Sequence, residues 1–215
     1  PFKDSILSLL SSHKGKEISV KDAIDDLRSE EIAESDYVTL INSCYVQHHS
    51  QSIDKQKNHI LRNNSDKIRA RFRLYQIMKS LPKSESKAIS KHLKTQGLSE
   101  LRSTTVTEVS KHWMLDLDGR KIATPSAKQV SNILSQLYTK KQTQRALSPN
   151  EPAPAALSIP DDACHYHESE SMQRTLTVRE MARIQSFPDW YQIKSKVTTG
   201  GQMRKFEVPQ YTQIG

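Results

Sequence analysis

Apolar residues recur at helical spacing between residues 65 and 97, and this pattern limits the fold more than any other feature of the chain. The stretch SDKIRARFRLYQIMKSL carries apolar side chains three or four positions apart, and Pro82 then ends the helix. A second pattern, SESKAISKHLKTQ, ends before Gly97, which suits a C-terminal cap. Two consecutive helices are therefore predicted. Arg69 and Arg73 lie four positions apart and are expected to share an exposed side of the first.

Capping patterns and turn residues predict the other elements. A Ser or Thr followed three positions later by Glu or Gln is typical of a helix start, and it occurs at Thr105–Glu108, Ser126–Gln129 and Thr177–Glu180. Ser19 is expected to cap a turn within 20–27, and the centre of 28–50 is expected to be helical. Asp118-Gly119 predicts a tight hairpin turn. Residues 50–64 and 139–156 are predicted as loops, with short strands near ALSIP at 156–160.

These elements give an α+β fold that is mainly helical with small β-hairpins. The apolar fraction of 35% allows only a thin core, so part of the surface is expected to face a partner. The order of two helices and a hairpin resembles a winged helix-turn-helix in outline. It lacks a base-reading motif, so this resemblance is weak.

Charge is distributed unevenly along the chain. Residues 1–50 carry a net charge of −4, residues 51–147 carry +13, and residues 148–215 carry −1. A strongly basic centre between weakly acidic flanks indicates a surface for a polyanion, most often nucleic acid. A solvated helical surface explains the same count about equally well.

The two cysteines, Cys44 and Cys164, are too few and too far apart for a disulfide framework or a zinc site. The run Cys-His-Tyr-His at 164–167 contains metal-ligand residue types, but its spacing cannot complete a tetrahedral site, and no metal is expected. No apolar run is long enough to span a bilayer, and reduced thiols indicate a cytoplasmic protein. The chain begins with Pro1 and ends at Gly215, so we expect it to be an excised piece of a longer protein.

The stretch RTLTVREMARIQSFPD at 174–189 resembles the ninth conserved motif of the DNA (cytosine-5) methyltransferases. QYTQIG at 210–215 resembles the approach to the tenth motif, and SVKDAIDDL at 19–27 resembles the segment that often follows the eighth. The elements NHI at 58–60 and ARF at 70–72, with the loop at 151–162, resemble the surroundings of the target-recognition region. The resemblance is weak across 73–150, where this family diverges most.

The resemblance implies a target-recognition domain excised from a Rossmann-like methyltransferase. Residues 1–27 would connect it to the catalytic domain, residues 28–170 would form the recognition domain, and residues 171–215 would return to the catalytic domain. The implied partners are double-stranded DNA and the missing catalytic domain of the same polypeptide, with no membrane. S-adenosylmethionine would be the cofactor of the full enzyme, and none is expected on this fragment.

The resemblance also suggests roles for individual residues. The ninth motif is expected to be structural and contains Arg174, Thr177, Arg179, Glu180, Gln185, Phe187 and Pro188. The tenth-motif approach would form the edge of the cofactor site with Tyr211, Gln213 and Gly215. The basic region suggests DNA contacts by Arg62, Arg69, Arg71, Arg73, Arg102, Arg120 and Lys121.

The catalytic residues of the family are expected to lie outside this chain. Its members use a thiolate after a proline, but Cys44 follows Ser43 and Cys164 follows Ala163. The Phe-x-Gly-x-Gly and Glu-Asn-Val motifs do not occur. The chain alone should therefore transfer no methyl group. Two alternatives stay open, a stand-alone winged-helix DNA-binding regulator and a non-catalytic subunit of a split methyltransferase.

Overall fold

The computed structural model describes residues 15, 17–44, 56–95, 97, 99–141, 143–154, 163–198 and 206–214. Helices predominate among these residues, with short strands, as expected for a mainly helical α+β chain. The elements are α2 (Val20–Ile24), η1 (Asp25–Leu27), α3 (Asp36–Ser43), α4 (Asp66–Ser80), α5 (Lys83–Lys94), α6 (Ser103–Ser110), β1 (Met114–Leu115), β2 (Lys121–Ile122), α7 (Ala127–Gln136), β3 (Arg145–Ala146), β4 (Ala163–Cys164), α8 (Val178–Ile184) and α9 (Gln210–Ile214).

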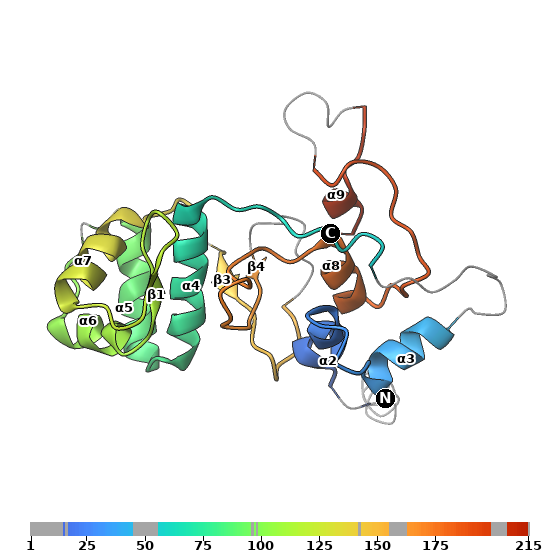
Figure 1. Ribbon diagram of the computed structural model, residues 1–215, viewed down its shortest axis with the longest axis horizontal. Coiled ribbons are helices and arrows are strands. Elements are labelled where there is room, and N and C mark those ends of the chain that lie inside the picture. Colours follow the sequence, from blue (N-terminus) through green and yellow to red (C-terminus); the bar gives the residue numbers. More distant parts are fainter. Residues whose placement is uncertain are drawn as a thin grey trace, which may run out of the picture.

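The elements α4 to α7 and the β1–β2 hairpin form one unit, which we call the helical lobe (Figure 1). Its core is built from the inward faces of the four helices and from the first strand of the hairpin, and it includes Phe72, Leu74, Ile77, Ile89, Leu93, Val109, Leu115, Val130, Ile133 and Leu134. These side chains are almost fully buried, so their removal from water is the main source of this lobe's stability. The periodicity of α4 and α5 read from the sequence is confirmed.

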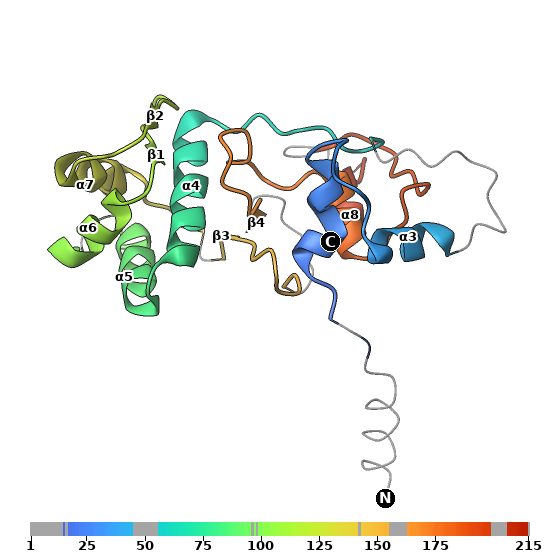
Figure 2. The ribbon, with the colours of Figure 1, turned by 60° about the horizontal axis from the view of Figure 1, so that its bottom comes forward.

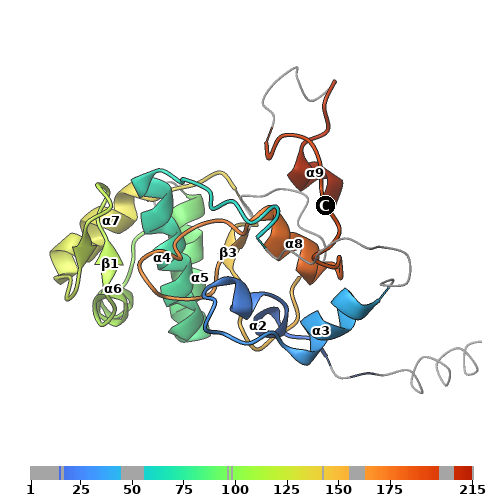
Figure 3. The same ribbon diagram turned by 45° about the vertical axis from the view of Figure 1, so that its right-hand side comes forward.

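The elements α2, η1, α3, α8 and α9 form a second unit, which we call the junction lobe. Figures 1 and 3 show α8 between the α2–α3 pair and α9. Its core contains Val20, Ile24, Leu176, Met181 and Tyr211. Helix α8 packs against both α2 and α9, so segments from the two ends of the described chain meet around it.

A parallel ladder of strands β3 and β4 lies between the two lobes, as Figure 1 shows. Arg145 pairs with Ala163, and Ala146 pairs with Cys164. Successive side chains of a strand point to opposite sides. Ala146 and Cys164 accordingly join the core of the helical lobe, whereas Ala163 and the following Leu147 join that of the junction lobe. Strand β3 arises within the segment predicted as a loop.

Most predicted caps are confirmed. Ser19, Ser126 and Thr177 each accept a hydrogen bond from the third backbone amide of the helix that follows. The hairpin turn at Asp118-Gly119 is confirmed too, with Gly119 at a φ of +79°.

The predicted helix start at Thr105 is wrong. Helix α6 begins at Ser103, and no side chain caps it. Thr105 is buried and donates its hydroxyl to Glu85 of α5 instead, so a contact between helices has replaced the local cap.

The strands predicted near 156–160 lie outside the described residues. Within the part of the chain that the structure describes, no helix is both long enough and apolar enough to cross a membrane.

Candidate functional site

Helix α8 is short, and nearly all of it is buried. Thr177 accepts a hydrogen bond from the Glu180 amide at 3.2 Å, and the Glu180 carboxylate accepts from the Thr177 amide at 2.7 Å. Every residue from Val178 to Arg183 is buried, including three charged side chains. Buried charges need partners, because each loses its hydration. The partners of these three therefore show what the helix holds together.

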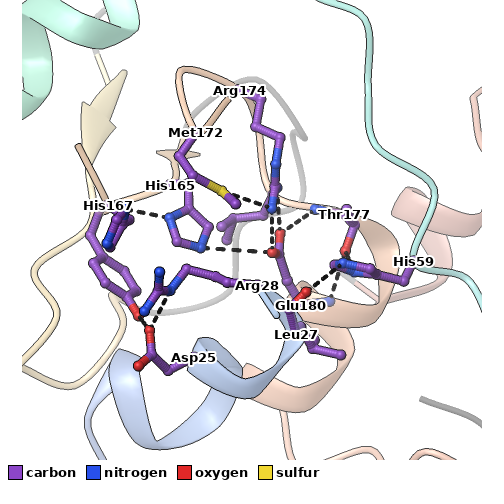
Figure 4. A network of polar contacts seen from close by, with 12 residues as sticks. Asp25, Leu27, Arg28, His59, His165, His167, Met172, Arg174, Thr177 and Glu180 are labelled. Atoms are coloured by element: carbon purple, nitrogen blue, oxygen red, sulfur yellow. Dashed lines mark hydrogen bonds and ion pairs between the residues drawn. The ribbon is translucent and has the colours of Figure 1, made fainter. Parts of the chain in front are cut away.

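Glu180 forms a bidentate ion pair with Arg174, at 2.7 and 2.8 Å (Figure 4). Burial would raise the pKa of Glu180, but the charge and hydrogen bonds of Arg174 outweigh it and lower the pKa to about 2. The fully buried His165 has its Nε2 atom 3.8 Å from Glu180. Burial lowers the pKa of His165 to about 4, so this ring is neutral at pH 7. The cluster therefore consists of one ion pair and a neutral imidazole.

His59 links α8 to η1 and is half-buried. Its Nδ1 atom lies 2.9 Å from the Thr177 hydroxyl, and its Nε2 atom lies 3.1 Å from the Leu27 carbonyl, as Figure 4 shows. A carbonyl only accepts, so Nε2 carries the proton and Nδ1 accepts from Thr177. Burial lowers the pKa of His59, in agreement with this neutral form.

Arg183 binds two carboxylates from distant parts of the chain. It contacts Asp189 through two hydrogen bonds of 2.7 and 2.8 Å, and it also donates to Asp26 of η1. Asn42 of α3 in turn accepts from the Asp189 amide at 2.7 Å and donates to the Asp189 carboxylate at 3.1 Å. This single arginine therefore connects α8, η1, α3 and the turn after α8.

Arg179 forms its hydrogen bonds with backbone carbonyls. Its guanidinium donates to the carbonyls of Lys57, Pro188 and Tyr191 at 2.9, 3.1 and 2.9 Å. Lys57 belongs to the segment 56–65, which runs across to the start of α4 in Figure 1. Asn58 strengthens this link through hydrogen bonds to the Ile193 carbonyl and amide. Helix α8 therefore fixes the segment that leads into the helical lobe.

The other predicted motif residues also have structural surroundings. Gln185 donates to the Ile214 carbonyl at 2.7 Å, Phe187 is half-buried, and Pro188 is buried at the end of α8. Of the predicted cofactor-edge residues, Tyr211 is buried and donates to the Leu176 carbonyl at 2.6 Å. Gln213 donates to the carbonyls of Lys194 and Val208. Gly215 lies outside the described residues.

The predicted basic residues have very different environments. Arg73 was expected on an exposed side, and this expectation is wrong. Its side chain is 1% exposed, lies 4.1 Å from the centre of the Trp113 ring, and pairs with Glu168 at 3.0 Å. Arg71 is half-buried and donates to the carbonyls of Leu137 and Tyr138. Both guanidinium groups are thus held by backbone carbonyls of the helical lobe.

Three further candidates are more accessible but have partners. Arg69 pairs with Asp66 at 3.0 Å, and Lys121 pairs with Glu170 at 2.5 Å. Arg102 pairs with Glu85 at 2.9 Å, between α5 and α6 and apart from the hairpin.

The remaining two candidates differ in position. Arg62 lies 5.6 Å from the Tyr211 ring, against the junction lobe. Arg120 is exposed at the hairpin turn, and its guanidinium makes no hydrogen bond or ion pair with the residues that the structure describes.

Several of these basic side chains gather around the start of α4. Figure 2 shows the β1–β2 hairpin beside the N-terminal end of this helix. A Cβ atom added at Gly119 would collide with the Asp66 carboxylate and lie 3.2 Å from the Arg69 guanidinium. On the other side of α4, Lys67 lies 5.2 Å from the ring of the exposed Tyr138. The structure therefore brings together Arg69, Arg120 and Lys121 around the hairpin, with Lys67 nearby on the other side of α4.

Neither described cysteine has the surroundings of a reactive thiol. Cys164 is completely buried in the core of the helical lobe, and burial raises its pKa. A thiol in such surroundings stays protonated and is a poor nucleophile. Cys44 is exposed at the end of α3. No group of metal-binding side chains occurs among the described residues.

Sequence reasoning did not find Asp26, Asn42, Asp189 and His165. Each is buried against a charge of α8 or beside it. The one available signal was Arg179 and Arg183 themselves, since two arginines in a short helix flanked by apolar residues require partners. Nothing in the local sequence identifies those partners.

The chain thus combines a basic helical lobe with a helix whose charges are buried. Comparison with known proteins identifies the class of protein to which it belongs. The family model of the C-5 cytosine-specific DNA methylases matches residues 9–215, so the chain belongs to this family of DNA (cytosine-5) methyltransferases. The chain is 36% identical over 90 residues to the Type II methyltransferase M.AquIB of Picosynechococcus sp. (strain ATCC 27264 / PCC 7002 / PR-6). That match covers 41% of this chain and 62% of the relative. No solved structure matches the chain.

Proposed function

We propose that this chain is the DNA-recognition part of a DNA (cytosine-5) methyltransferase and that the residues which carry out methyl transfer lie outside it. The full enzyme would transfer a methyl group from S-adenosylmethionine to carbon 5 of cytosine. The observation that carries this proposal is the contrast between α8 and α4. The charges of α8 are buried and paired, whereas the start of α4 presents exposed cations.

This contrast supports a division of the chain into a part that faces DNA and a part that connects it to the enzyme. Residues 28–170 would form the recognition domain, with the helical lobe facing DNA. Residues 1–27 and 171–215 would connect it to a catalytic domain through the junction lobe. Arg179 supports this arrangement, because it binds the segment that leads into α4. The lobe would thereby keep a fixed orientation toward the catalytic domain.

The cations around the start of α4 fit a duplex surface. Lys67, Arg69, Arg120 and Lys121 come from two adjacent elements, and all carry their charge near solvent. Each Lys or Arg that neutralises a phosphate releases counterions, which makes DNA binding depend on salt. The partners Asp66 and Glu170 do not prevent this, because surface ion pairs contribute only about 0–1 kcal/mol.

The test is duplex DNA binding measured by fluorescence anisotropy between about 50 and 200 mM salt. We expect the logarithm of the affinity to fall with the logarithm of the salt concentration with a slope of several units. A flat response would contradict the proposal. In a second assay with labelled S-adenosylmethionine and duplex DNA, the chain should transfer no methyl group, and turnover would show that it contains the catalytic residues.

A second candidate is a separate recognition subunit that a partner chain completes. The relative M.AquIB favours it, because the same 90 residues make up 62% of that protein and only 41% of this chain. A protein named a methyltransferase is thus shorter than this one. Size-exclusion chromatography of this chain with a separately expressed catalytic chain, followed by a methyl-transfer assay, tests it. Activity that appears only in the mixture would support a subunit. The stand-alone winged-helix regulator instead predicts sequence-specific binding with no such complex.

A further inference from the structure

The tip of the β1–β2 hairpin carries two opposite charges whose side chains make no hydrogen bond or ion pair with the described residues. Asp118 and Arg120 are both exposed and flank Gly119. The other cations on this surface differ, since Arg69 and Lys121 each pair with a carboxylate. The hairpin therefore presents one free acceptor and one free donor side by side.

The side chain and the backbone of Asp116 form the hydrogen bonds that stabilise the turn. The Asp116 carboxylate accepts from the amides of Asp118 and Arg120 at 2.9 and 2.8 Å. The Asp116 amide donates to the Arg120 carbonyl at 2.9 Å, and its carbonyl accepts from the Gly119 amide at 3.2 Å. Four hydrogen bonds thus fix a short turn. Its two charged side chains project from a defined backbone, as precise recognition requires.

The base of the hairpin is held as firmly. Trp113 precedes β1 and lies between two cations, with the Arg73 guanidinium 4.1 Å and the Lys121 ammonium 5.2 Å from its ring. Arg73 also donates to the Trp113 carbonyl at 3.0 Å. At the other end, Gly119 lies against the Asp66 side chain, which a side chain at position 119 would have to displace. The hairpin is therefore fixed to α4 at both ends.

The negative charge of Asp118 distinguishes two modes of DNA binding by this tip, contact with phosphates and contact with base edges. A tip that contacted only phosphates would gain from Arg120 and lose from the negative charge of Asp118. Base edges in the major groove offer a partner for each, because Arg binds guanine O6 and N7 and Asp accepts from the cytosine amino group. The major groove also admits a two-stranded β-ribbon.

We infer that Asp118 and Arg120 read a G·C base pair in the major groove, with the surrounding cations on phosphates. This inference rests on the proposed function and adds which residues determine specificity and which base pair they select. Arg120 donates to the guanine and Asp118 accepts from the cytosine. Lys67, Arg69 and Lys121 position the hairpin without reading sequence.

The test uses the full chain and a library of duplexes with randomised central positions, at about 100 mM salt. Bound and unbound duplexes are sequenced for the wild type, Arg120→Ala and Asp118→Asn. Lys128→Ala and Glu100→Gln are matched controls, because each removes one exposed charge of the same sign away from the hairpin. Thermal unfolding verifies that all variants are folded.

We expect the wild type to enrich G·C at one position at least. Arg120→Ala should reduce that enrichment about 5- to 150-fold, the value of one bidentate base contact. Asp118→Asn should reduce it too while binding all duplexes more tightly, because a negative charge is lost. The two controls should change affinity without changing the preferred sequence.

Each other outcome contradicts the inference. A wild-type chain that binds DNA in a salt-dependent way without base preference excludes sequence reading by the hairpin and leaves the proposed function standing. A preference that survives both hairpin substitutions assigns the reading to other residues. A wild-type chain that does not bind DNA contradicts the inference and the proposed function together.

Discussion

The two lobes use arginine in opposite ways. In the junction lobe, Arg179 and Arg183 are fully buried, and their guanidinium groups bind the Lys57 carbonyl, the Asp26 carboxylate and the turn after α8. At the hairpin of the helical lobe, Arg120 is exposed and has no described partner. The positive charge of the chain therefore cannot be treated as one DNA-binding quantity. Burial and partners decide which arginines hold the fold and which face a ligand.

Arg73 is an exception to this difference between the lobes. It belongs to the basic helical lobe, but it resembles the junction arginines in being buried and paired. Each lobe therefore has its own buried arginine, and the predictions below test whether burial or location determines the effect of a substitution.

The largest effect is expected for Arg183→Ala. The substitution removes the ion pairs that Arg183 makes with the buried carboxylates of Asp26 and Asp189. Breaking a buried ion pair from one side costs about 3–5 kcal/mol, so the free energy of unfolding should fall by that amount. Urea unfolding followed by circular dichroism measures it. Arg120→Ala is the control and should change stability by less than about 0.5 kcal/mol. Equal losses of stability in the two variants would contradict the proposed difference between the buried arginines of the junction lobe and the exposed arginine of the hairpin.

The second effect is a pH dependence that originates at His165. Burial lowers its pKa from 6.5 to about 4, so the unfolded chain binds a proton before the folded one does. Stability should be complete above pH 6.5 and should fall as the pH decreases toward 4, by on the order of 3 kcal/mol. Glu180 keeps its charge across this range, because its pKa is about 2.

His165→Asn should flatten this dependence, since Asn cannot gain the proton and can still accept from the His167 amide. The measurement is the urea midpoint at several pH values, compared as slopes and not as absolute stabilities. His59 also has a lowered pKa and leaves a residual slope of the same sign. An unchanged slope in the variant would mean that other groups cause the acid sensitivity.

The third effect concerns Arg73→Ala. It removes the hydrogen bond to the Trp113 carbonyl, the contact with the Trp113 ring and the pair with Glu168. We expect a loss of about 1–3 kcal/mol, because a partly buried carbonyl loses its donor while Glu168 stays half exposed and hydrated. Unfolding monitored by tryptophan fluorescence reports it. A substitution that weakens DNA binding at unchanged stability would place Arg73 with Arg120 instead.

The sequence predicts local structure in this chain better than it predicts burial. The caps at Ser19, Ser126 and Thr177 and the turn at Gly119 were predictable, because each depends on side chains within a few positions. Thr105 shows the limit. Thr105 has the same capping pattern, but its hydroxyl binds Glu85 of another helix and caps nothing. A rule based on neighbouring residues cannot predict this contact.

In the candidate site, too, the sequence predicted the local structure and missed the contacts between distant segments. The resemblance to the ninth motif located α8, and its capping pair identified where the helix starts. Arg183 also binds Asp26, and its nearer partner Asp189 binds Asn42. Both Asp26 and Asn42 lie far away along the chain, so no spacing rule identifies them. The helical pattern of α4 likewise placed Arg73 outside, because a charged residue at an inward position is an exception that only a partner such as Trp113 permits.

The smallest effect on stability, and the one that separates the lobes most directly, is expected for Arg69→Ala. Arg69 is partly exposed and pairs with the exposed Asp66, so its loss should change the free energy of unfolding by less than about 0.5 kcal/mol. If it contacts one phosphate, the slope of log affinity against log salt should decrease by about 1 for all duplexes alike. Arg102→Ala is the matched control, because Arg102 is also exposed and pairs with Glu85 away from the hairpin. Identical slopes in both variants would mean that the start of α4 does not contact the DNA backbone, and a changed base preference in Arg69→Ala would assign it to sequence reading beside Arg120.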